Sequence, residues 1–255
     1  MRIIHVAGLS GSGKTTFIRS LIPELSRLGP VAAVKHIGHH SWSLEEGKDT
    51  TFYLHAGAHQ SVGIDHEKTV SVMNETDLGS TLRMLCDMGI RYAVVEGFKS
   101  KPFPKVLIGT LPGATGVVLE NPGTGDVIAS IGSFMEYYTI GGMITEMRAE
   151  NRGAPGGVFT SMCTGITGAN ETLPPDMEKF RISLDNAMKR AIKDGEILAG
   201  RSYFGPDLPG GTDEVVRIAV LAPSIIKGTT FIRDLVQHFS EEPEKNVKIT
   251  AGEEI

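Results

Sequence analysis

GLSGSGKT, residues 8–15, is the stretch that decides the fold of this chain. Two glycines separated by four residues precede a lysine and a threonine, which is the complete phosphate-binding loop pattern. Glycines permit backbone angles that turn successive N–H groups toward phosphate oxygens. Lys14 supplies positive charge to the β- and γ-phosphates, and the Thr15 hydroxyl can ligate Mg²⁺. The stretch therefore predicts a site for a nucleoside triphosphate.

The segments on either side of the loop have the required secondary structure. Residues 2–7, RIIHVA, are apolar and partly β-branched, as in a short buried strand. Apolar residues then recur at helical spacing from Phe17 to Leu28, and Gly29 is placed to end that helix. The start of the helix adds a positive dipole end where the phosphates would bind.

Two further apolar runs end in polar residues that suit the same site. Residues 30–36, PVAAVKH, end in Lys35 and His36, and the run at 90–97 ends in Glu96. In open α/β sheets, ligands bind outside the carboxyl ends of the strands. We therefore expect these side chains beside the loop, with Glu96 holding Mg²⁺ or its water, where most such folds carry aspartate.

The region between these strands is rich in histidine and contains a Lys–Asp pair. Lys48 and Asp49 follow a flexible glycine and could reach phosphate or Mg²⁺, or could instead form a solvated turn and a helix cap. Residues 50–60 could be helical, which would place two of the histidines, His55 and His59, on one face. A metal cluster is one interpretation and separate structural histidines are the other. Six of the eight histidines lie here: His36, His39, His40, His55, His59 and His66.

Three segments in this order resemble the family of molybdopterin-guanine dinucleotide biosynthesis protein B, MobB. They are GLSGSGKTT, then AVKHIGHHSWSLEEGKDT, then VVEGFKSKPFPKV, and the resemblance covers residues 1 to about 110, with weaker support to about 140. It implies a GTP-binding P-loop protein that assists attachment of a GMP unit to molybdopterin. In that family a separate partner, MobA, performs the transfer. It also implies a homodimer with weak GTPase activity.

The resemblance implies roles for particular residues of this chain. Nucleotide and cofactor contacts fall on Gly8, Leu9, Ser10, Gly11, Ser12, Gly13, Lys14, Thr15, Thr16, Lys35 and His36, catalytic roles on Lys14, Asp49 and Glu96, and Mg²⁺ ligation on Thr15 and Glu96. One departure concerns the base, because the NKxD motif that reads guanine in GTPases is absent. The nearest string, NETD at 74–77, lacks the lysine, so guanine preference rests on the resemblance alone.

Composition excludes several other classes of protein. The 255 residues carry a formal net charge of -5, which is unlike the basic footprint of a nucleic-acid-binding protein. Two separated cysteines suggest neither a disulfide framework nor a cysteine zinc site, and fit a reducing cytoplasm. The apolar run at the N-terminus is too short and glycine-broken for a membrane span.

The sequence predicts an α/β fold: a P-loop NTPase-type, mostly parallel sheet with flanking helices in residues 1–142, and a smaller α+β region in 143–255. Residues 111–132 suggest two short strands around Pro122 and Gly123. Residues 148–176 read as an irregular boundary, and 200–214 as a turn-rich segment. Between and after them we expect an amphipathic helix capped by Asp176 and ended by Gly195, and a strand at 215–223.

KGTTFIRDL, residues 227–235, repeats much of GKTTFIRSL, residues 13–21. An ungapped alignment of 3–28 with 217–242 gives ten identities in 26 positions. The loop glycines and Lys14 are nevertheless replaced, and β-branched Ile225 and Ile226 resist the positive φ that a phosphate loop needs. The repeat predicts a strand–turn–helix unit without a second nucleotide site.

Three alternatives to an accessory GTPase stay open on the sequence. The histidines would suit a nickel or cobalt metallochaperone GTPase. The phosphate loop would equally suit a small-molecule kinase, although no arginine-rich lid segment is evident. A non-catalytic adapter that binds nucleotide to dock its partners is the third.

Overall fold

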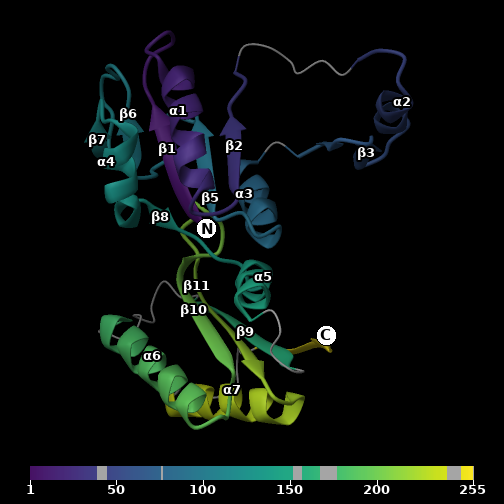
Figure 1. Ribbon diagram of the computed structural model, residues 1–255, viewed down its shortest axis with the longest axis vertical. Coiled ribbons are helices and arrows are strands. Elements are labelled where there is room, and N and C mark those ends of the chain that lie inside the picture. Colours follow the sequence, from purple (N-terminus) through teal and green to yellow (C-terminus); the bar gives the residue numbers. More distant parts are fainter. Residues whose placement is uncertain (39–44, 76, 152–156, 167–176, 240–247, 255) are drawn as a thin grey trace.

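The computed structural model describes residues 1–38, 45–75, 77–151, 157–166, 177–239 and 248–254 (Figure 1). The first unit contains β1 (Arg2–Ala7), α1 (Lys14–Ser26), β2 (Val31–Lys35), α2 (Asp49–His55), β3 (Gln60–Ile64), β4 (Thr69–Met73), α3 (Leu78–Asp87), β5 (Tyr92–Glu96), β6 (Lys105–Leu107), β7 (Val117–Glu120), α4 (Thr124–Ala129), the short 3₁₀ turn η1 (Ile131–Ser133), β8 (Met135–Glu136) and α5 (Ile140–Glu150). The second unit contains β9 (Val158–Ile166), α6 (Met177–Lys193), β10 (Ala199–Pro206), β11 (Glu214–Ala222), α7 (Ile225–Phe239) and β12 (Lys248–Glu254).

The main sheet has the strand order β2-β5-β1-β6-β7, and these strands are parallel to one another. β8 pairs antiparallel with the start of β1. Alternate residues of β1 face opposite ways: Ile4 and Val6 pack with α1 and α4, whereas Ile3 lies in the cluster with α3 and α5. The predicted mostly parallel sheet with helices on both faces is confirmed.

An arm made of α2, β3 and β4 is separate from this sheet. β3 and β4 form a two-stranded antiparallel sheet, and Figure 1 shows α2 and β3 at a distance from the main sheet. The predicted helix over 50–60 extends too far, because α2 ends at His55 and Gly57 follows with φ 102°. His59 therefore lies outside the helix, and the two histidines do not share one helical face.

The second of the two strands expected around Pro122 and Gly123 is a helix. β7 forms as predicted, but the following residues form α4, in which the Asp126 carboxylate accepts a hydrogen bond from the Gly123 N–H at 2.8 Å. Val127 is fully buried in the cluster that contains α1. A short apolar run suits helix or strand, and here the cap and the packing decide for helix.

The second unit is a four-stranded antiparallel sheet with the order β10-β11-β9-β12. Its chain order, β-α-β-β-α-β, is that of a split βαβ, ferredoxin-like arrangement. β11 and α6 match the predicted strand and helix, and Gly195 follows α6 with φ 71°, while the expected cap Asp176 lies outside the described residues. The predictions of an irregular boundary over 148–176 and a turn-rich 200–214 are wrong where β9 and β10 form.

Both faces of this second sheet are covered, which explains why β9 and β10 form. On β11, Val216, Ile218 and Val220 pack with α6 and α7, whereas Val215 and Leu221 belong to the cluster shared with α3 and α5. α5 lies between the two sheets in Figure 1 and contacts α3 as well as β11. The predicted boundary at 142–143 falls inside this helix. In the described ranges, no helix is long and apolar enough to span a bilayer.

A buried arginine joins the two units. Arg217 of β11 is 3% exposed and donates hydrogen bonds to the carbonyl oxygens of Tyr138 at 2.8 Å and Asp207 at 3.0 Å. It also pairs with the Asp207 carboxylate, which Arg83 of α3 approaches at 2.8 Å. The Tyr137 hydroxyl donates to the Asp207 carbonyl oxygen at 3.0 Å. The segment after β10 is thus held against α3 and the segment before α5.

Candidate nucleotide-binding site

The phosphate loop connects β1 to α1 through six residues, 8–13. Gly11 and Gly13 have φ of 75° and 90°, the left-handed backbone that lets consecutive N–H groups face one side. Gly8 has φ 153°, and a Cβ there would lie 2.1 Å from the Ile108 carbonyl oxygen, so only glycine fits. The backbone therefore has the conformation of an anion-binding loop at the start of a 13-residue helix.

Lys14 is the first residue of α1, and its side chain turns back over the loop. Its Nζ donates a hydrogen bond to the Leu9 carbonyl oxygen at 2.6 Å. The ammonium group is thus held at the loop, and Lys14 lines the same cavity as residues 10–13. Phosphate oxygens bound there would meet both kinds of donor.

The carboxyl ends of three neighbouring strands bring a threonine, a lysine and a glutamate together. Lys35 and Glu96 are register partners on β2 and β5, and Lys35 Nζ lies 3.5 Å from Glu96 Oε1. Thr15 Oγ1 donates to Glu96 Oε2 at 3.5 Å. These groups line a cavity of about 340 Å³ together with Ser10, Gly11, Ser12, Gly13, Lys14 and Thr16.

The oxygen atoms of Thr15 and Glu96 are the pair that could hold a Mg²⁺ ion. A hydroxyl and a carboxylate are the hard oxygen ligands that Mg²⁺ prefers, and Mg²⁺ usually completes its shell with water and phosphate. The cavity lies beside both groups, so bound phosphate oxygens would adjoin them. The chemistry of these residues therefore fits the metal.

His36 and Asp49, predicted for the same cleft, are not among the residues that line this cavity. The His36 ring stacks on Phe98 with ring centroids 4.6 Å apart, and its backbone N–H donates to the Glu96 carbonyl oxygen at 2.9 Å. Asp49 is the first residue of α2 on the arm, where the neighbouring Lys48 pairs with Glu45 at 3.5 Å. Their roles toward nucleotide stay predictions.

A histidine metal centre finds no support in the described part of the chain. No group of three or more histidine, cysteine, aspartate or glutamate residues there is arranged to hold a metal ion. His55 ends α2 and His59 precedes β3, while His39 and His40 lie outside the described residues.

His5 is the site-adjacent residue that the sequence did not reveal. It lies in the middle of β1, fully buried, with its Nε2 2.6 Å from the carbonyl oxygen of Gly97, next to Glu96. Burial lowers the pKa of His5, the hydrogen bond to Gly97 opposes that shift, and the positive charge of Lys105 adds to it. An imidazole inside an otherwise apolar strand was the only sequence signal.

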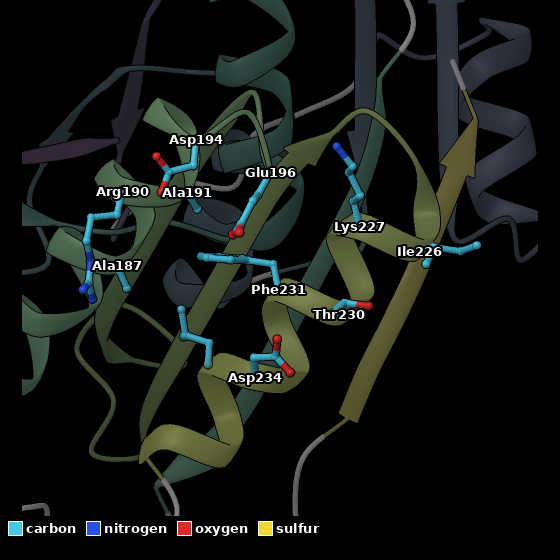
Figure 2. A pocket seen from close by; sticks show the side chains of 11 residues that line it. Ala187, Arg190, Ala191, Asp194, Glu196, Ile226, Lys227, Thr230, Phe231 and Asp234 are labelled. Atoms are coloured by element: carbon cyan, nitrogen blue, oxygen red, sulfur yellow. The ribbon is translucent and has the colours of Figure 1, made fainter.

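The repeat near the C-terminus does not form a second phosphate loop. Only Pro223 and Ser224 separate β11 from α7, so the aligned loop positions form the first turn of the helix. Lys227 Nζ donates to the Gly195 carbonyl oxygen at 3.4 Å. Figure 2 shows Lys227 at a separate cavity of about 640 Å³ that is lined by residues of α6, α7 and the turn after α6. The prediction of a strand–turn–helix unit is confirmed.

Comparison with known proteins identifies the first unit. The family model of Molybdopterin guanine dinucleotide synthesis protein B matches residues 3–131, just over half of the 255 residues. A Molybdopterin-guanine dinucleotide biosynthesis adapter protein of Haemophilus influenzae is 37% identical over 111 residues, which cover 42% of this chain and 62% of the relative. A relative named as a putative adapter protein of the same kind, from Methanocaldococcus jannaschii, is 34% identical over 99 residues, or 39% of this chain and 42% of the relative.

The match thus spans less than two thirds of the length of each of these relatives. Among solved structures, Bacillus subtilis MobB aligns with a TM-score of 0.39 and 29% identity, over 47% of this chain and 77% of that one. The phosphate loop, Lys35 and Glu96 all lie within residues 3–131. On the extent of the family match, this chain belongs to the MobB family.

Proposed function

We propose that this protein binds GTP with Mg²⁺ at the phosphate loop and acts as an accessory protein with weak GTPase activity in the formation of molybdopterin guanine dinucleotide. The observation that carries the nucleotide part is the convergence of Thr15, Lys35 and Glu96 on the loop that contains Lys14. The pathway is inferred from membership of the MobB family and from the names of the relatives.

Each group has a distinct task in this proposal. The loop N–H groups and Lys14 bind the phosphates, and Thr15 and Glu96 hold Mg²⁺, which when bound supplies positive charge to the phosphate oxygens. Lys35 pairs with Glu96 and orients that carboxylate at the edge of the cavity. His36 lies beside the site, where its ring stacks on Phe98. Asp49 would contact the nucleotide only if the arm approached the loop.

Molybdopterin is the proposed second ligand and a MobA-like guanylyltransferase the proposed partner. A purified guanylyltransferase supplied with molybdopterin and limiting GTP is expected to form the dinucleotide several-fold faster when this protein is added. The product is measured by chromatography of the released cofactor. An unchanged rate with folded protein that binds GTP would contradict the accessory role, and Lys14→Ala protein is the matched negative control.

A homodimer is proposed from the arm. Phe52, Tyr53 and Ile64 are 55%, 57% and 79% exposed, so the arm presents large apolar side chains to solvent. A second copy would bury them, which is favourable. Sedimentation velocity is expected to give twice the chain mass of 27.4 kDa, and Ile64→Asp is expected to shift the protein toward monomer. A wild-type monomer at micromolar concentration would contradict this.

A cytoplasmic location is proposed on chemical grounds. Cys86 is buried and Cys163 is half-buried, and both are free thiols. Free thiols persist in a reducing compartment.

A further inference from the structure

His5 faces the side of the main sheet opposite α1. It is 0% exposed, its ring meets the Phe103 ring edge-on at a centroid distance of 5.9 Å, and its register partner on β6 is Lys105. Lys105 is also buried, and its Nζ donates to the Lys101 carbonyl oxygen at 3.2 Å. The imidazole is therefore enclosed by the strands and by the segment that follows Glu96.

The hydrogen bond to Gly97 fixes the state of the ring. A carbonyl oxygen only accepts, so Nε2 carries the proton in the 2.6 Å contact. The lowered pKa keeps the ring neutral, and Nδ1 then has only a lone pair. Nδ1 is buried without a hydrogen-bond partner among the residues that the structure describes. The neutral His5 ring thus donates its one N–H to the Gly97 carbonyl oxygen.

The acceptor lies in a strained turn. Gly97 and Phe98 have φ of 95° and 46°, so two consecutive residues directly after Glu96 have left-handed backbone. This backbone is unfavourable for a bulky residue such as Phe98, so surrounding contacts must hold it. A Cβ at Gly97 would lie 2.7 Å from His36 Cβ, and the His36 ring stacks on Phe98. His5 supports this turn from within the sheet and His36 supports it from the side.

Histidine at this position leaves Nδ1 without a partner but supplies a donor to the Gly97 carbonyl oxygen. Leucine or phenylalanine would fill the interior of the strand and would leave that carbonyl oxygen without this donor. What histidine adds is one N–H at the carbonyl next to the residue that contacts Thr15 and Lys35. The contacts of Glu96 are 3.5 Å each, so a small displacement of the turn would break them.

We infer that His5 is a positioning residue: through the Gly97 carbonyl oxygen it holds the strained turn that sets the Glu96 carboxylate beside Thr15. This inference rests on the proposed role of Glu96 as a Mg²⁺ ligand. His5 touches neither nucleotide nor metal. Loss of the His5 side chain is expected to weaken Mg²⁺ binding. The phosphate loop, which follows the end of β1, is expected to stay in place.

The test measures Mg²⁺ binding rather than turnover. A fluorescent GTP analogue bound to the full-length protein is titrated with Mg²⁺, and its affinity is also measured in EDTA. His5→Leu is expected to raise the Mg²⁺ concentration at half-saturation about tenfold, while the affinity in EDTA stays within about twofold of wild type, since one charge-assisted contact is weakened. His5→Asn, which keeps a side-chain N–H donor, is expected to recover most of the loss.

Ile3→Val is the matched control for a general loss of stability. Ile3 lies two residues earlier on the same strand and face and is equally buried. Ile3→Val is expected to leave the Mg²⁺ titration unchanged. An equal shift in Ile3→Val and His5→Leu, or no shift in His5→Leu, overturns the inference. If His5→Leu does not fold, His5→Phe removes the same donor and keeps a ring against Phe103.

Glu96→Gln separates this inference from the proposed function. If Glu96→Gln weakens Mg²⁺ binding and His5→Leu does not, the positioning role is wrong and the site assignment stands. If Glu96→Gln has no effect on Mg²⁺ binding, the proposed Mg²⁺ site and the inference built on it are both wrong. A shift in both variants supports both.

Discussion

Replacing Lys14 by alanine is expected to weaken GTP binding about 100-fold, roughly 3 kcal/mol. The Nζ of Lys14 lies over the loop, 2.6 Å from the Leu9 carbonyl oxygen, where phosphate oxygens would replace that weak intraloop contact with charge-assisted bonds. Alanine removes the charge and leaves the loop glycines and the helix unchanged. Isothermal titration calorimetry with Mg²⁺ present measures the affinity, and circular dichroism checks the fold.

The repeat supplies the matched control for this substitution. Lys227 begins the string KGTTFIRDL, yet its Nζ contacts the carbonyl oxygen of Gly195, in the turn after α6, and lies in the second unit. Lys227→Ala is expected to leave GTP affinity within error of wild type. GTP affinity that survives Lys14→Ala would show that the nucleotide binds elsewhere, and a large loss in Lys227→Ala would point to the second unit.

Replacing Arg217 by leucine is expected to destabilise the protein by about 3–5 kcal/mol. The side chain is 4% exposed and donates to two carbonyl oxygens in addition to its pairing with Asp207. Its guanidinium also lies over the rings of Tyr137 and Tyr203, at 5.6 and 5.5 Å from their centroids. Leucine would remove the donor to the Tyr138 carbonyl oxygen and the buried partner of the Asp207 carboxylate, whereas the Asp207 carbonyl oxygen would keep the Tyr137 hydroxyl. The melting temperature is expected to fall on the order of 10 °C by calorimetry.

Arg83→Met is the control for Arg217→Leu, because Arg83 contacts the same carboxylate. The Arg83 side chain is 42% exposed, so its ion pair is screened by solvent, and the expected loss is below about 1 kcal/mol. Equal losses of stability in the two variants would mean that the buried contacts of Arg217 do not hold the two units together. A loss confined to a separate, lower-melting transition would mean that the two units unfold independently.

Local sequence patterns predicted the loop and the strand ends that line the cavity, but they did not predict contacts between residues that are distant in the sequence. The loop, α1 and the strand-end residues Lys35 and Glu96 follow from motif spacing and from the rule that ligands bind at carboxyl ends of parallel strands. β9 was missed because its Thr, Ser, Cys and Gly residues carry no alternating pattern, and pairing on both sides with β11 and β12 makes it a strand.

The same distinction explains the residues that were missed. His5 acquires its role from Gly97, 92 positions away, and Arg217 from Tyr138, 79 positions away. Neither the spacing of motifs nor the periodicity of apolar residues indicates which residues so far apart in the sequence are in contact. For Asp49 the sequence pattern and the structure point to different roles. Its position in the GKDT string suggested a contact with the nucleotide, whereas in the structure Asp49 is the first residue of α2 on the arm. Asp49 lies in the first turn of that helix, where a negative charge interacts favourably with the helix dipole whether or not a ligand is bound.

Calorimetric titration of the wild-type protein with GTP and with ATP, in Mg²⁺ and with or without molybdopterin, tests the central claim most directly. GTP is expected to bind at one site per chain, more tightly than ATP, and more tightly still with molybdopterin present. Equal affinity for ATP, or an affinity for GTP that molybdopterin leaves unchanged, would contradict a role for this protein in molybdopterin guanine dinucleotide formation.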